Sequence, residues 1–374
     1  MARQSRLPAA LAALGIFAVG SWVAAARASY IEEEFKEPSE VVPRPRPVPI
    51  PAPLPHVPEL ADYLARVDVG QPCVYRGLAI YPLTVRGGVL SGEWLTLDQA
   101  VARGVLHVIE KGSEGTVPTI VMENRSRDAH VFIMAGEVVT GGKQTRTVRQ
   151  DVVLAPGQQV NLSVFCVEAH RWSGKSEFAA SGLLVPQSIQ KEMRKGADQS
   201  AVWTEVARNN AALGTENATG SLEAGLKAGR VQDELAAVRK AILPEVPRGS
   251  VGFVFAWDGQ PLGAELFGRS DLARALLPKL VDAYAVDLVL AREDKGLPMV
   301  DAKALAAAFL AQVRRAGSSR ASTPGSGAGI QTRAAGLVGD GVSLGSDVVH
   351  YGCQVEERIV PVPKPIITPR NENE

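Results

Sequence analysis

The stretch VRQDVVLAPGQQVNLSVFCV, residues 148–167, consists of two runs of β-branched and apolar residues joined by an Ala-Pro-Gly turn. Val and Phe favour strands, and Pro followed by Gly is a typical turn sequence. We therefore predict that residues 144–154 and 158–168 pair as antiparallel strands. This pairing would bring Gln144 and Arg146 close to Glu168.

Similar runs extend outward from this pair on both sides. Strand-like runs are Gly77–Val85, Val105–Glu110, Thr119–Glu123, Val131–Met134, Val251–Trp257, Leu262–Phe267, Ala334–Val338 and Val342–Val349. Helical periodicity is found in Leu97–Arg103, Pro186–Lys195, Asp198–Leu213, Val231–Leu243, Ser270–Arg292 and Asp301–Arg315. The pattern predicts an α+β fold: a β-sandwich or partly closed barrel-like sheet core built from both ends of the domain, with a helical middle.

The N-terminal part of the chain has the features of a secretory signal. Two arginines precede an apolar run from Leu7 to Val23, and Ala26-x-Ala28 fits the small-x-small pattern of signal peptidase. We predict a signal peptide at residues 1–28 and a periplasmic or extracellular protein. The alternative is an uncleaved membrane anchor, which would be the chain's only contact with a membrane.

Proline-rich segments flank the expected domain. Proline recurs at nearly every second or third position from Pro43 to Pro58, which favours an extended polyproline spacer. We predict a tether at residues 29–65, one globular domain at residues 66–357 and a proline-rich tail at residues 358–374. The tether is also a possible contact for an envelope protein.

The charge balance disfavours nucleic acid as a partner. The chain has 40 basic and 40 acidic residues, and residues 1–28 hold three Arg and no acid. Without them the balance is 37 minus 40, a net charge of −3. A general nucleic-acid binder needs a basic face, so this class is not expected.

The chain has three cysteines, Cys73, Cys166 and Cys353. An odd number in an exported protein allows at most one internal bridge. Cys73 and Cys353 lie near the two ends of the expected domain, where terminal strands often pair. We therefore predict a disulfide between them, with Cys166 reduced.

The densest polar stretch runs from Gly136 to Trp172 and contains the candidate site residues. Gly141-Gly142 would let the backbone approach an anion closely, and Lys143, Gln144 and Arg146 follow. The alternative is a loop with solvated charges.

The strand from Val160 carries the second half of this stretch. Val160, Leu162, Val164, Cys166, Glu168 and His170 share one face by the period of two. Cys166 is then most simply a small core residue. Glu168 continues a buried face and needs a partner, for which Lys143, Arg146 and Arg171 are candidates. Cys166, Glu168 and His170 are too few ligands for a closed metal site, so no metal and no cofactor are predicted.

Two pieces of this stretch, GEVVTGGKQTRTV and FCVEAHRW, resemble the ARG and rhodanese-phosphatase-superfamily-associated protein domain family. GLAIYPL, EWLTLDQA, AVWTEVARNNAALG and GQPLGAELFGRSDLARALLPKLVDAYAVDL extend the resemblance over about residues 66 to 355. The family's recurring residues correspond to Glu137, Gly141, Lys143, Gln144, Arg146, Cys166, Glu168, Arg171 and Trp172. Thr145 stands where Asn is usual, and Ala169-His170 also departs from the pattern. The name implies a role around NAD, ADP-ribose or phosphorylated ligands, without an established activity.

Three functions remain open from the sequence. In the first, Lys143, Gln144, Arg146 and Arg171, with Gly141 in the turn, hold a small anionic ligand. In the second, Glu137 and Glu168 are the acid and base of a hydrolase acting on a nucleotide-like or glycosidic bond. In the third, the charges form a structural or interaction cluster without a ligand. We expect these side chains, including Glu137, to converge on one partly open pocket.

Overall fold

The computed structural model describes residues 55–87, 90–112, 118–291 and 302–356. The predicted signal peptide, most of the tether and the tail from residue 358 lie outside these ranges. Within them, none of the helices has the length and apolar character needed to cross a membrane.

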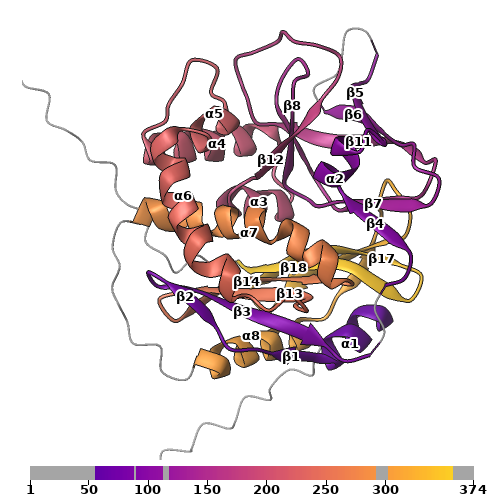
Figure 1. Cartoon of the computed structure of the whole chain (residues 1–374), viewed down its shortest axis with the longest axis vertical. Helices are drawn as coiled ribbons and strands as arrows, with labels where there is room; N and C mark the ends of the chain where they lie inside the picture. The colour runs from indigo at the N-terminus through magenta and orange to yellow at the C-terminus, as the bar shows by residue number, and fades with distance from the viewer. Residues whose placement is uncertain (1–54, 88–89, 113–117, 292–301, 357–374) are drawn as a thin grey trace, which may run out of the picture. The chain divides into compact units, whose positions relative to one another are not determined.

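The fold is α+β, as predicted (Figure 1). The helices are α1 Pro58–Ala65, α2 Leu97–Ala102, α3 Gln187–Arg194, α4 Gln199–Leu213, α5 Leu222–Leu226, α6 Gly229–Ile242, α7 Ser270–Ala291 and α8 Ala302–Ala316, with a 3-10 turn, η1, at Leu243–Glu245. The strands of the first half are β1 Val67–Val69, β2 Cys73–Tyr75, β3 Leu78–Val85, β4 Glu93–Thr96, β5 Leu106–Glu110, β6 Thr119–Asn124, β7 Ala129–Ile133, β8 Glu137–Thr140, β9 Arg146–Val148, β10 Val152–Leu154, β11 Gln159–Cys166 and β12 Ala179–Leu184. Those of the second half are β13 Gly252–Trp257, β14 Gln260–Phe267, β15 Ser319–Ala321, β16 Ala328–Ala334, β17 Leu337–Leu344 and β18 Asp347–Val355.

The largest sheet joins strands from both ends of the domain. Its order is β1-β3-β13-β14-β18-β17-β16-β15, with β2 also paired to β3. On β3 the side chains alternate between two cores, because successive residues of a strand point to opposite faces. Leu78 and Ile80 join a core with α7, whereas Tyr81 and Leu83 join a core with α1 and α8. The large sheet is therefore covered by helices on both faces (Figure 1).

Two smaller sheets build the part of the fold that carries the candidate site. One has the order β10-β7-β4 and the other the order β12-β8-β9-β11-β6-β5. The alternating pattern of β11 is visible in its burial, because Val160 and Leu162 are buried between exposed Gln159, Asn161 and Ser163. From Val164 to Cys166 every residue is buried. Leu162 and Val164 pack into the third core, together with Ile120 and Val148.

The last eight residues of the tether predicted for residues 29–65 form a helix of the folded domain. Pro58–Ala65 form α1, which begins with proline at its first turn, a position that proline favours. Leu60 and Leu64 of this helix are almost fully buried in the core beside α8. The folded domain therefore starts before residue 66.

The predicted disulfide between Cys73 and Cys353 is wrong. Both cysteines are buried and unpaired, and so is Cys166. Cys73 belongs to the core on the α7 face of the large sheet, and Cys353 to the core on the α8 face. Three strands also separate β2 from β18. That separation is roughly 19 Å at the usual strand spacing, far beyond the Cα separation of about 7 Å that a disulfide allows.

Candidate functional site

The candidate site is built where β9 and β11 end beside each other. They pair antiparallel, as predicted, with Val148 opposite Val164 and Arg146 opposite Cys166. The remaining halves of the two predicted strands have other partners, since β10 pairs with β7 and the start of β11 pairs with β6. The pairing places the Lys-Gln-Thr-Arg segment next to the Cys-Val-Glu segment.

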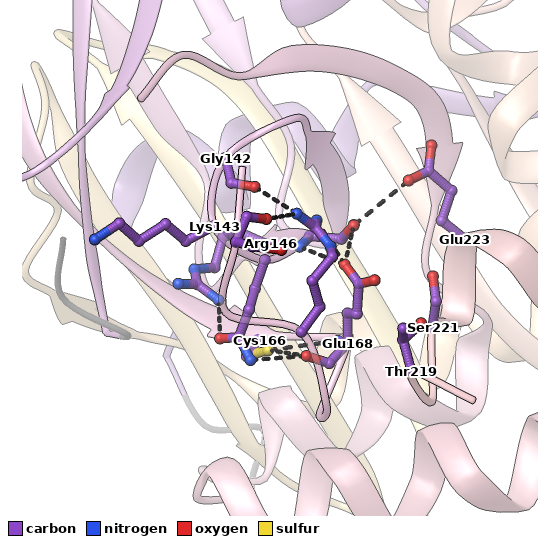
Figure 2. A network of polar contacts seen from close by, with 12 residues as sticks. Gly142, Lys143, Arg146, Cys166, Glu168, Thr219, Ser221 and Glu223 are labelled. Carbon is purple, nitrogen blue, oxygen red and sulfur yellow. Dashed lines mark hydrogen bonds and ion pairs between the residues drawn. The ribbon is translucent and has the colours of Figure 1, made fainter. Parts of the chain in front are cut away.

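Glu168 is held by a dense set of donors (Figure 2). Its Oε2 accepts hydrogen bonds from the Thr145 backbone N–H at 3.1 Å, from Thr145 Oγ1 at 3.0 Å and from Arg171 Nη2 at 2.7 Å. Burial alone would raise the pKa of Glu168, but the hydrogen bonds from Arg171 and Thr145 outweigh it and hold the pKa below its usual range. Glu168 is therefore an ionised anchor for the loop that carries Arg171.

Arg171 ties two loops together at the edge of the cluster. Its Nη1 donates to the Gly142 carbonyl at 2.8 Å and to the Ser173 carbonyl, and Ser173 N–H donates to the Lys143 carbonyl at 3.2 Å. A side chain on Gly142 would collide with the Phe178 ring, so this close approach requires glycine. Gly141 has a φ of +109°, which also favours glycine. The predicted glycine turn thus shapes the loop contact.

Arg146 lies deeper than any other charged group of the cluster. Its side chain is 0% exposed, and its Nη1 donates to Gln144 Oε1 at 2.6 Å. Gln144 Nε2 in turn donates to the Glu168 carbonyl at 2.9 Å. Nε and Nη2 of Arg146 have no hydrogen-bond partner, and its guanidinium forms no ion pair, among the residues that the structure describes. Burial lowers the pKa of Arg146, although the nearby Cys166 and Glu110 oppose this shift.

Cys166 behaves as a buried core thiol. Its sulfur donates to the Glu168 carbonyl at 2.9 Å. Burial raises the pKa of the thiol, although the Glu168 backbone and the Arg146 side chain oppose the shift. A protonated, enclosed sulfur of this kind is a poor nucleophile.

Lys143 and Trp172 form the outer part of the cluster. Lys143 extends away from Glu168 (Figure 2), and its ammonium lies 5.5 Å from the centre of the Trp172 ring. The Arg146 guanidinium lies 5.7 Å from the same ring. Trp172 is half exposed, so the cluster reaches the surface on this side.

Glu137 does not join this cluster, contrary to the expected convergence. Its Oε1 accepts from Lys279 Nζ of α7 at 2.7 Å, and its Oε2 accepts from the Met134 backbone N–H at 2.8 Å. Lys279 Nζ also contacts Asp98 of α2 at 2.5 Å. Glu137 is completely buried in this second ion cluster, which links the helices α2 and α7 to β8. His170 is exposed and is likewise outside the network around Glu168.

Several members of the site were not identified from the sequence. Glu110 is buried at the end of β5, and its Oε1 accepts from the Lys143 backbone N–H at 2.9 Å, while its Oε2 has no partner among the described residues. The sequence does indicate that Glu110 is buried, because the period of two places it on the same face of β5 as Leu106 and Val108. Glu168 follows the buried face of β11 in the same way. Gln199 of α4 bonds both the backbone N–H and the carbonyl of Cys166, and nothing in the local sequence indicates this contact.

A cavity of about 240 Å³ lies elsewhere, between Trp94, Gln99, Arg103 and Arg269. Its Arg269 differs from Arg146 because all three of its nitrogens are engaged. They donate to Asp271 and to the carbonyls of residues 90 and 92. The cavity therefore offers no unsatisfied buried cation, and the Arg146 cluster remains the stronger candidate.

Comparison with known proteins gives one match. Neither a curated protein nor a solved structure matches the chain. Residues 66–353, well over half of the 374-residue chain, match ARPP-1, the ARG and Rhodanese-Phosphatase-superfamily-associated Protein domain. This range contains the whole cluster around Arg146 and Glu168. The chain therefore belongs to the ARG and Rhodanese-Phosphatase-superfamily-associated Protein domain family.

Proposed function

We propose that this domain binds a small anionic ligand, with Arg146 as the principal contact. The observation that carries the proposal is a completely buried guanidinium whose Nε and Nη2 have no hydrogen-bond partner among the described residues. The Trp172 ring, 5.7 Å from the guanidinium, does not replace these hydrogen bonds. Arginine remains charged in proteins, and an isolated buried charge costs several kcal/mol, on the order of the whole stability of a small domain. A phosphate or carboxylate group bound in a bidentate manner would satisfy the two nitrogens together.

The charges around Arg146 suit an anion. Glu223 accepts a hydrogen bond from Thr145 Oγ1 and is paired with Lys227. Four positive charges (Lys143, Arg146, Arg171 and Lys227) and three negative ones (Glu110, Glu168 and Glu223) leave a formal excess of one positive charge. Arg171 is already paired with Glu168 at 2.7 Å. Arg146, by contrast, forms no ion pair among the residues that the structure describes.

The hydrolase alternative receives less support from the geometry. β8 and β11 run parallel on the two sides of β9, and Val139 and Cys166 share Arg146 as their register partner. Glu137 precedes Val139 by two residues, and Glu168 follows Cys166 by two residues. Because β8 and β11 are parallel, the two glutamates lie on opposite sides of Arg146 along the strand direction. Their Cα atoms are then roughly 16 Å apart, and the two carboxylates have separate partners. Glu137 is bound by Lys279 and Glu168 by Arg171, so these two carboxylates do not face each other across one bond as the paired carboxylates of glycosidases do.

Calorimetric titration with ribose 5-phosphate tests the binding function. The wild type should bind this probe, and Arg146→Met should weaken binding at least tenfold, because a hydrogen bond to a charged group contributes about 1.5 to 3 kcal/mol. Arg149→Met is the matched control, since Arg149 is exposed and lies three residues further along the chain. Equal affinity of the wild type and Arg146→Met would refute the role of Arg146, and absence of binding to the wild type would refute the proposed function.

We also propose that the domain acts outside the cytoplasm. The support is the basic start, the apolar run and the Ala26-x-Ala28 pattern of residues 1–28. The intact mass of the protein from its native host tests this. A mass corresponding to a chain that begins near Ser29 is expected, and a mass that includes residues 1–28 would indicate an anchor.

A further inference from the structure

Two of the few exposed large apolar side chains lie at the cluster around Arg146. The large hydrophobic side chains that are exposed among the described residues are Val74, Ile109, Trp172 and Trp203, and the two tryptophans are 48% and 36% exposed. Tryptophan is costly to expose and is frequent in binding surfaces. Its occurrence twice beside one buried arginine therefore needs an explanation.

Trp172 approaches the cluster from the loop after β11. Its ring centre is 5.7 Å from the Arg146 guanidinium and 5.5 Å from the Lys143 ammonium. The loop around it is fixed by Arg171, which donates to the Gly142 carbonyl, and by Ser173, which donates to the Lys143 carbonyl. The indole is thus held at the edge of the cationic group.

Trp203 approaches from α4. Gln199 and Trp203 are one helical turn apart and share a face of this helix. Gln199 bonds the backbone of Cys166 on both its N–H and its carbonyl, at 2.8 Å each. The Trp203 side chain is among the groups that oppose the effect of burial on the pKa of Cys166. Because Cys166 is the register partner of Arg146, Trp203 lies beside the same cluster as Trp172.

We propose that the ligand of this site is a phosphorylated compound that carries a flat aromatic ring, with its anionic group on Arg146 and its ring on Trp172 and Trp203. This inference rests on the proposed function and specifies its ligand class. Arginine satisfies an anion, whereas exposed indole rings provide stacking surfaces that tolerate any flat ring. A mononucleotide has both parts, and a bare sugar phosphate has only the first.

Calorimetric titrations with AMP and with ribose 5-phosphate test the proposal, because the two probes differ by the adenine ring. The wild type should bind AMP about tenfold more tightly. Trp172→Ala and Trp203→Ala should each reduce the affinity for AMP more than the affinity for ribose 5-phosphate, so that the preference for AMP decreases. Trp172→Phe keeps a ring and should retain most of the preference. Val74→Ala is the control, since Val74 is 52% exposed on β2, in a different sheet.

The outcomes separate this inference from the proposed function. Equal affinity of the wild type for AMP and ribose 5-phosphate would overturn the inference and leave the proposed function intact. An undiminished AMP preference in both alanine variants would also overturn it. If neither probe binds to the wild type, the proposed function fails and this inference fails with it. The wild-type comparison remains decisive even if an alanine variant does not fold.

Discussion

Arg146 and Cys166 lie opposite each other on β9 and β11, and both side chains are completely enclosed. The arginine brings a charge into the interior, yet the neighbouring thiol stays protonated, because burial raises its pKa and outweighs the opposing effect of Arg146. The pair therefore combines a buried cation with a neutral partner. The neutral thiol does not neutralise Arg146, so the charge of Arg146 can pair with a bound anion.

The three cysteines should be unreactive in the native protein. All three are buried and unpaired, so iodoacetamide should modify none of them readily in the native protein. After denaturation without reductant, mass spectrometry should show three modified thiols. A single modified thiol in the denatured protein would instead reveal a disulfide.

Glu168→Gln should destabilise the domain at neutral pH. The neutral amide loses the charge that Arg171 and Thr145 stabilise, which costs about 2 kcal/mol of unfolding free energy. The pKa of Glu168 is lower in the folded protein than in the unfolded chain, so its contribution is present above the unfolded pKa and is lost as pH falls through the folded value.

Urea denaturation at pH 7 and at decreasing pH measures this difference. The difference in unfolding free energy between the wild type and Glu168→Gln should decrease as the pH falls below about 4. Glu192→Gln, at a surface pair with Lys195, is the control and should have little effect. A difference that stays constant with pH would contradict the role of the Glu168 charge.

Lys279 should be essential to the second ion cluster. Burial alone would lower the pKa of Lys279, but Glu137 and Asp98 outweigh it and raise the pKa, so the ammonium is charged. Lys279→Met should cost about 3 to 5 kcal/mol of unfolding free energy, because it leaves Glu137 buried without its cation. Adding Glu137→Gln should recover most of this loss. Chemical denaturation of both variants, with Lys240→Met as a surface control, checks this. A double variant as unstable as Lys279→Met alone would contradict it.

His350 should make stability depend on pH in the alkaline range. Its Nδ1 lies 2.6 Å from Asp151 Oδ2 and its Nε2 lies 3.1 Å from Glu265 Oε2. Burial alone would lower the pKa of His350, but the two carboxylates outweigh it and raise the pKa to about 9, against 6.5 for an ordinary histidine. Protonated His350 therefore contributes roughly 3 kcal/mol to the unfolding free energy. This contribution is fully present below the unfolded pKa and is lost as pH rises through the folded pKa.

Denaturation between pH 6 and pH 9.5 tests the His350 prediction. The unfolding free energy of the wild type should decrease over this range more steeply than that of His350→Gln. Other groups, such as the unfolded thiols, titrate in both proteins and cancel in the comparison. Parallel profiles for the two proteins would show that His350 does not provide the dependence.

The sequence predicts the local features of the site better than its distant contacts. The Ala-Pro-Gly turn and the alternation of β11 predict that Gln144 and Arg146 come close to Glu168, and the structure places Arg146 opposite Cys166 with Gln144 bonded to the Glu168 carbonyl. These local patterns do not show that Glu137 forms an ion pair with Lys279, which is 142 residues away in the chain. A local pattern shows that a carboxylate is buried and needs a cation, and the tertiary fold decides which cation it is.

The disulfide prediction failed for the same reason. The positions of Cys73 and Cys353 near the two ends of the domain correctly place both in one sheet. The order of strands within that sheet is set by tertiary pairing, which puts three strands between them. One residue of register also decides which face a side chain occupies, and the two cysteines are on opposite faces.

We propose that Arg146 binds a ligand and does not stabilise the fold. The most direct measurement is the unfolding free energy of the wild type and of Arg146→Met, each with and without ribose 5-phosphate. We predict that Arg146→Met is at least as stable as the wild type without the probe, because an apolar side chain removes an unpaired buried charge. We also predict that only the wild type gains stability from the probe. A loss of about 2 kcal/mol or more in ligand-free Arg146→Met, with the same gain from the probe as in the wild type, would contradict the claim.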